Sequence, residues 1–126
     1  MHWVIDGNNV FGSRPDGWWN DRTGAAGRLA QRVAEWCRTH DDRVTLVFDA
    51  PVDGATLELA GGNLAIELAK RRGRNAADDR IVELVGAFEG VEEGLLVVTS
   101  DNGLRRRLEG RASVLGAGRF LERLDE

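Results

Sequence analysis

Three short, continuous apolar runs constrain the fold more than any other feature of this sequence. They cover residues 3–5, 44–48 and 95–99, are rich in β-branched residues and do not alternate with polar residues. Runs of this kind are typical of strands that are buried on both faces of a sheet. We therefore predict strands at these positions, and we expect two weaker strands at 64–69 and 112–116.

Helical periodicity lies between the predicted strands. Apolar residues recur at helical spacing in 29–37 and again in 81–88, and Asp21 or Thr23 can cap the first of these helices. Two shorter helices are expected at 102–109 and 118–124. Because strands and helices alternate with short connections, we predict an α/β fold with a mostly parallel sheet and helices on both faces. Residues 12–21 predict a long loop between the first strand and the first helix.

Composition narrows the class of protein. The 126 residues fit one domain, 1–126, with 42% hydrophobic and 30% charged residues, which are ordinary globular values. No apolar run approaches the roughly 20 residues needed to span a bilayer, and Asp6 interrupts the first apolar stretch too early for a signal peptide. Cys37 is the single cysteine, so no internal disulfide can form. We expect a cytoplasmic protein that does not bind membranes.

Each of the three strong strand candidates leads into an aspartate, namely Asp6, Asp49 or Asp101. Because ligands bind beyond the carboxyl ends of parallel strands, these three carboxylates are expected to converge at one edge. Asp78 and Asp79 begin the helix around 81–88; Asp78 leans toward the sheet, and Asp79 is rotated about 100° from it. As an alternative, each aspartate alone can serve as a helix cap or a turn residue.

Clustered carboxylates need a compensating charge. Two of them about 4 Å apart repel by about 4 kcal/mol at an effective dielectric constant near 20, which is a large part of the stability of a small domain. Hard oxygen ligands suit Mg²⁺ or Mn²⁺, and such ions would offset the repulsion. The net charge of the chain is -4, but basic residues cluster at 70–74 and 105–107, so parts of the surface are expected to be positive. Together these features favour hydrolysis of phosphodiester bonds.

Four motifs resemble a known family, and they run in order over nearly the whole chain: DGNNV at 6–10, VFD at 47–49, NAADDRI at 75–81 and VTSDNGLR at 98–105. The sequence is similar to the NYN domain of the PIN-like nuclease superfamily, especially its YacP-like branch. The resemblance implies a PIN-like three-layer α/β/α sandwich. It also implies a hydrolase, a ribonuclease that depends on magnesium or manganese and binds RNA. Endonuclease and exonuclease cleavage both stay open, as do a monomer and a homodimer.

The resemblance also assigns roles by motif position. Asp6, Asp78 and Asp101 take the main catalytic and metal-ligand places, with Asp79 beside them and Asp49 as an additional ligand. The implied contacts with phosphate, water or a ligand come from Asn8, Asn9, Ser100 and Asn102. Gly7 is expected to let the backbone approach a ligand closely, with an Asx-type turn as the alternative. Many PIN domains carry a glutamate on the helix after their first strand; no equivalent is identified here, so one ion or two stay open.

Basic and aromatic residues near this edge complete the predicted site. Arg14, Arg74 and Arg105 are the candidates for binding the phosphate backbone, with a solvated helix face as the alternative. Trp18 and Trp19 either stack on splayed bases or pack over the core, and packing is favoured. Two other functions stay in play: an RNA-binding module of the same fold without turnover, and a metal-dependent phosphatase. The phosphatase is least favoured because DxD and GxxxxGK motifs are missing.

Overall fold

The computed structural model describes residues 1–49, 51–69, 76–88 and 94–125. Within these residues, five strands form one sheet in the order β3-β2-β1-β4-β5, and every neighbouring pair is parallel. The strands are β1 (His2–Asp6), β2 (Arg43–Phe48), β3 (Leu64–Leu68), β4 (Leu95–Val98) and β5 (Ser113–Leu115). All five predicted strands are thereby confirmed.

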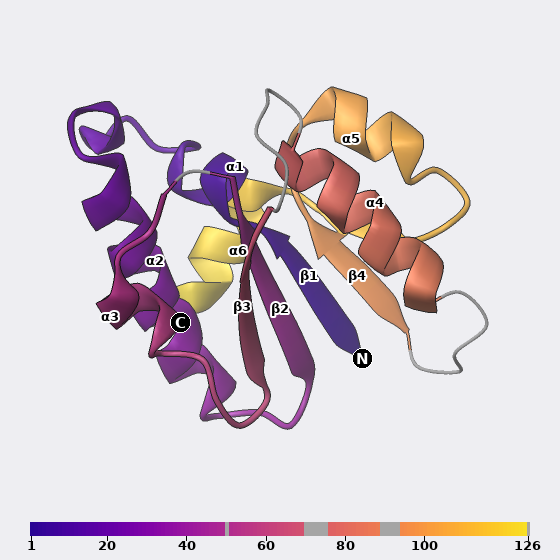
Figure 1. Ribbon diagram of the computed structural model, residues 1–126. Coiled ribbons are helices and arrows are strands. Elements are labelled where there is room, and N and C mark those ends of the chain that lie inside the picture. The colour runs from indigo at the N-terminus through magenta and orange to yellow at the C-terminus, as the bar shows by residue number, and fades with distance from the viewer. Residues whose placement is uncertain (50, 70–75, 89–93, 126) are drawn as a thin grey trace.

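Helices cover both faces of the sheet (Figure 1). They are α1 (Gly7–Phe11), α2 (Arg22–Cys37), α3 (Gly54–Leu57), α4 (Ala76–Phe88), α5 (Asn102–Arg107) and α6 (Ala117–Leu124), with a 3₁₀ turn, η1, at Trp18–Asn20. Helices α1, α2 and α6 pack on one face, and α4 and α5 pack on the other. This arrangement confirms the predicted three-layer α/β/α architecture.

Alternation along β1 explains why its apolar run is continuous. Trp3 and Ile5 point toward α2 and α6, whereas Val4 points toward α4 and α5. On the first face the Trp3 ring lies 5.0 Å from that of Trp36 and 6.0 Å from that of Phe120, measured between centroids. A central strand therefore needs apolar side chains at every position, because both of its faces are buried.

The order of the strands places the functional edge. The chain runs outward from β1 through β2 to β3, and then crosses by α4 to β4 on the other side of β1. The direction of winding thus reverses between β1 and β4. In open α/β sheets, ligands bind at the carboxyl ends of the strands beside such a reversal. Asp6 ends β1, and Asp101 follows β4 by three residues.

Two short helices differ from the sequence prediction. Helix α1 follows β1 directly and was not predicted, so the DGNN segment does not form the alternative Asx-type turn; the irregular segment begins at Gly12, as the predicted loop does. The packing gives a reason for Gly7: a Cβ there would lie 2.5 Å from the Phe48 ring and 2.8 Å from the Val47 carbonyl oxygen, while its close approach to a ligand stays a prediction. Glycine is therefore required for α1 to pack against β2. Helix α3 was not predicted either.

The remaining helices agree with the sequence. Asp21 caps α2 by accepting a hydrogen bond from the Gly24 backbone N–H at 2.9 Å. In the part of the chain that the structure describes, none of the helices has the length and apolar character needed to cross a membrane.

Candidate active site

Asp6 is the buried centre of the carboxyl edge. Only 4% of the residue is exposed, and the Thr99 hydroxyl donates a hydrogen bond to Asp6 Oδ2 at 2.9 Å. The pKa of Asp6 is raised to about 7, chiefly because the carboxyl is buried; the Thr99 hydrogen bond lowers it, and the nearby charge of Asp78 contributes to the rise. A carboxylate in this position is costly to ionise unless a cation neutralises it.

Thr99 connects the two strands that meet at the reversal. Its side chain is fully buried; the hydroxyl donates to Asp6 and accepts a hydrogen bond from the backbone N–H of Asp101 at 3.1 Å. Thr99 was not predicted to be a member of the site. The available signal was a polar residue at the end of a buried strand, inside the 98–105 motif.

Asp101 has two structural roles at once. It follows β4 at the carboxyl edge, and its Oδ1 accepts a hydrogen bond from the Leu104 backbone N–H at 2.9 Å, which caps α5. The capping alternative is thus confirmed, together with the predicted position. Asparagine caps a helix about as well as aspartate, so the charge of Asp101 is not needed for capping.

Asp78 and Asp49 lie near Asp6 and Asp101. Burial raises the pKa of Asp78, and the charge of Asp101 raises it further, followed by weaker effects of Asp49 and Asp79. Asp49 is exposed, yet partial desolvation raises the pKa of its carboxyl, while Arg22 lowers it. The predicted convergence is therefore observed as mutual repulsion among carboxylates from β1, β2, β4 and α4.

Helix α1 holds the strand ends together through two neighbouring asparagines. Asn8 Oδ1 accepts a hydrogen bond from the Asp49 backbone N–H at 3.0 Å, and Asn9 Oδ1 accepts one from the Ser100 N–H at 2.7 Å. Ser100 Oγ in turn accepts from the Ala117 N–H at 2.8 Å, at the start of α6. Asn8, Asn9 and Ser100 thus lie at the predicted edge and fix its backbone; their contact with a substrate stays a prediction.

The basic residues of the predicted site have different environments, and their contact with phosphate stays a prediction. Arg107, which was not singled out, donates a hydrogen bond to Asp79 Oδ1 at 2.9 Å. Arg105 and Asn102 are exposed on α5. Arg14 forms an ion pair with Asp125 at 3.2 Å. Arg74 and the rest of the basic segment at 70–74 lie outside the described residues.

The two tryptophans of the irregular segment separate into different environments. Trp18 packs on the core, with its ring centroid 5.9 Å from that of Phe11, and the Arg22 guanidinium lies 5.5 Å from the Trp18 centroid. The packing interpretation is thereby confirmed for Trp18. Trp19 contacts Trp18 edge to face and is 53% exposed.

The chain is similar to a known protein family and to solved structures. The YacP-like NYN domain matches residues 3–126. The chain belongs to the YacP-like NYN family. This is a nuclease-type family of hydrolases.

Two crystal structures are similar to this NYN domain: Rae1 (YacP) from Bacillus subtilis, and a mutant of it with one tryptophan replaced by leucine. Both are 26% identical in sequence to this chain. The first superimposes with a TM-score of 0.79 over 99% of this chain, and the mutant with 0.78 over 98%; each match covers 74% of the Rae1 chain. No curated protein matches the sequence.

The donor set of this NYN domain can be tested for metal binding. Among the described residues, no three acidic, histidine or cysteine side chains lie together in an arrangement that would hold a metal ion. The chemistry of the donors nevertheless fits Mg²⁺ or Mn²⁺, since Asp6, Asp49, Asp78 and Asp101 present only hard oxygen atoms. The pKa values of Asp6, Asp49 and Asp78 are raised, chiefly by desolvation, so a bound cation would offset the cost of ionising these carboxyls.

Proposed function

We propose that this NYN domain is a ribonuclease that hydrolyses RNA phosphodiester bonds with divalent ions bound at the carboxyl edge. The ions would be Mg²⁺ or Mn²⁺, held by Asp6, Asp78 and Asp101, with Asp49 and Asp79 around them. The single observation that carries the proposal is the buried Asp6, whose pKa is raised to about 7 beside other carboxylates. Strongly perturbed acidic groups in a common cluster are typical of functional sites.

The residues that hold the carboxyl edge together have defined tasks in this proposal. Thr99 holds one oxygen of Asp6 and the backbone of Asp101, so both carboxylates keep a fixed orientation. Asn8 and Asn9 keep the ends of β2 and β4 close to α1. A divalent ion bound there would activate a water molecule and neutralise charge on the phosphate.

The surroundings of the edge favour RNA as the substrate. Trp19 is 53% exposed, and an exposed aromatic ring can stack on a base of a single strand. Ser100, Asn102 and Arg105 are exposed, so a strand can cross the edge without a free end. We therefore expect endonucleolytic cleavage.

The test uses single-stranded, structured and circular RNA, each incubated with Mg²⁺, Mn²⁺ or EDTA. The proposal predicts cleavage of the circular RNA with either ion and none with EDTA. Asp101→Asn is the sharpest variant, because it retains the cap of α5 and removes only the charge. Its cleavage rate should fall by about a hundredfold or more.

Two results would overturn the proposal. One is cleavage that persists in EDTA, and the other is full activity in both Asp101→Asn and Asp6→Asn. Tight binding of RNA without cleavage under any metal would instead identify an RNA-binding module of the same fold.

A further inference from the structure

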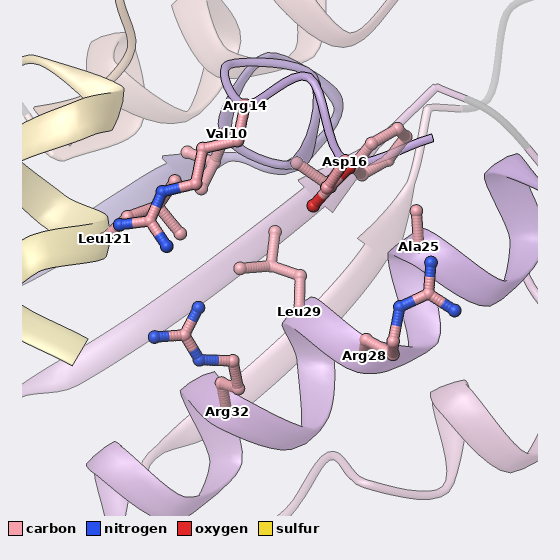
Figure 2. A pocket seen from close by; sticks show the side chains of 9 residues that line it. Val10, Arg14, Asp16, Ala25, Arg28, Leu29, Arg32 and Leu121 are labelled. Atoms are coloured by element: carbon pink, nitrogen blue, oxygen red, sulfur yellow. The ribbon is translucent and has the colours of Figure 1, made fainter. Parts of the chain in front are cut away.

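A second polar site lies on the other side of α1 from the acidic edge. It is a cavity of about 160 Å³ between α1, the segment that follows it, α2 and α6. Arg14, Arg28 and Arg32 line this cavity, which we call the arginine pocket, and Asp16 lies on its rim (Figure 2). Val10 and Leu29 line its apolar floor, and Leu121 closes it from α6.

Two of the guanidinium groups already hold an anion. Arg14 donates a hydrogen bond to Asp125 Oδ2 at 3.2 Å, and Arg32 donates one to Asp125 Oδ1, so one carboxylate receives an arginine on each oxygen. The side chains of this ion-pair group are partly exposed, Arg14 at 42%, Arg32 at 36% and Asp125 at 52%. Exposed ion pairs contribute little to stability, so a better anion can displace Asp125 at low cost.

The charge of the pocket is not balanced by its own residues. Its lining holds three arginines and one aspartate, Asp16, and Arg14 and Arg32 share Asp125. The Arg28 guanidinium lies near the carboxylate of Asp21 at the start of α2, but among the described residues it forms no salt bridge. Guanidinium groups bind phosphate oxygens in pairs, as they bind carboxylates. A terminal phosphate carries about -1.5 to -2 charges at neutral pH, which matches two arginines better than one carboxylate does.

Helix α1 links the pocket to the acidic edge. Asn8 and Asn9 of α1 bind the backbone beyond β2 and β4, whereas Val10 and Phe11 of the same helix line the pocket. The two sites are therefore back to back on one short helix. A strand whose end is held in the pocket can continue around α1 toward the carboxylates.

We propose that the arginine pocket binds the 5′-terminal phosphate of an RNA strand, with Arg14 and Arg32 as its clamp and Asp125 occupying the place of the phosphate until RNA displaces it. The apolar floor then packs against the first ribose and base. The choice of RNA rests on the proposed function, whereas the phosphate chemistry follows from the pocket itself.

The experiment measures binding of two short single-stranded RNAs of the same sequence, one with a 5′-monophosphate and one with a 5′-hydroxyl, both labelled at the 3′ end. Fluorescence anisotropy in EDTA keeps binding separate from cleavage. The natural chain should prefer the phosphorylated RNA by about fivefold to tenfold. Arg32→Gln should abolish this preference, and Asp125→Asn should increase it by about threefold, because it removes the competing carboxylate.

Arg43→Gln is the matched control. Arg43 is exposed at the start of β2, at the opposite edge of the sheet, and its substitution changes the net charge as Arg32→Gln does. It should weaken both RNAs equally and leave the preference unchanged. Thermal unfolding of each variant confirms that the fold is intact.

Equal binding of both RNAs by the natural chain would overturn the proposal, as would a preference that Arg32→Gln leaves intact. Competition by a nucleoside 5′-monophosphate as strong as that by the phosphorylated RNA would assign the pocket to a free nucleotide and overturn the assignment to an RNA end. These outcomes are distinct from failure of the proposed function. A chain that never cleaves RNA but keeps the preference refutes only the hydrolysis.

Discussion

The two ends of the same sheet treat their polar groups in opposite ways. At the amino edge, Asp42 accepts a hydrogen bond from the indole N–H of Trp3 at 3.1 Å, and this bond lowers the pKa of Asp42. The Asn63 side-chain amide donates to the carbonyl oxygens of His40 and Asp42 at 3.0 and 2.7 Å. The bond from Trp3 favours the charged form of Asp42, and the Asn63 amide satisfies two backbone carbonyl oxygens.

At the carboxyl edge the shifts have the opposite sign. Asp6, Asp49 and Asp78 all have raised pKa values, so the fold destabilises their charged forms. The amino edge contributes to stability, whereas the carboxyl edge reduces stability at neutral pH and so requires another explanation. Locally unfavourable arrangements that persist in a folded protein are expected at functional sites.

The largest expected effect is on the rate of RNA cleavage, when an aspartate of each edge is replaced by asparagine. Asp6→Asn should reduce the rate of RNA cleavage by about 10³-fold, because the amide retains the shape but carries no charge to bind a cation. Asp42→Asn should leave the rate within about twofold, since it affects only contacts with Trp3 and the N-terminal amine at the amino edge. Initial rates at saturating RNA measure both. Equal losses in the two variants would contradict the functional difference between the edges.

The pH dependence of stability is the next largest effect. Asp6 has an ordinary pKa of 3.8 and a folded pKa of about 7. Between these values the folded state binds more protons, so stability falls as pH rises; below them both states are protonated and nothing is lost. The total cost is about 4 kcal/mol, most of it between about pH 4 and pH 7. Urea unfolding in EDTA measures this fall.

The same scan has an internal control. Asp6→Asn should remove most of the pH dependence and unfold at higher urea than the natural chain at about pH 8. Asp42→Asn should keep the slope of the natural chain. A slope that is identical in all three proteins would mean that Asp6 titrates normally.

Addition of metal should reduce the difference between the edges. At about pH 8 the carboxylates are ionised, and Mn²⁺ at about 100 times its dissociation constant would stabilise the fold by about 2.7 kcal/mol. At about pH 5 protons compete for Asp6, so the gain should be smaller. Thermal unfolding with and without Mn²⁺ gives both values, and an equal gain in Asp6→Asn would place the ion elsewhere.

The elements that the sequence predicted are those with a continuous apolar run or with helical periodicity. The runs at 3–5, 44–48 and 95–99 are long enough to show burial on both faces, and all three are strands. Helices α1 and α3 have five and four residues, which is too short for helical periodicity to be visible. Their positions depend on contacts such as that of Gly7 with Phe48, which join distant parts of the chain.

The same distinction applies to the candidate site. The aspartates could be placed at one edge, because the carboxyl ends of parallel strands meet there whatever the detailed packing. Thr99 and Arg107 were missed because their importance comes from individual hydrogen bonds, chiefly with groups far along the chain: Thr99 bonds to Asp6 and the Asp101 backbone, and Arg107 bonds to Asp79. The ion pair of Arg14 with Asp125 spans 111 positions in the sequence, so no local pattern could indicate it.

The smallest expected effects compare one asparagine from each edge. Asn63→Ala removes two hydrogen bonds and should lower the free energy of unfolding by about 1–2 kcal/mol without changing the cleavage rate. Asn9→Ala removes one acceptor, that of the Ser100 N–H, and should cost only about 1 kcal/mol. It should nevertheless lower the cleavage rate by about tenfold, because Ser100 lies between Thr99 and Asp101 and a small displacement misaligns both. Urea unfolding and initial rates on the same two variants decide the matter. If the more destabilising substitution also caused the larger loss of activity, the carboxyl edge would differ from the amino edge in stability alone.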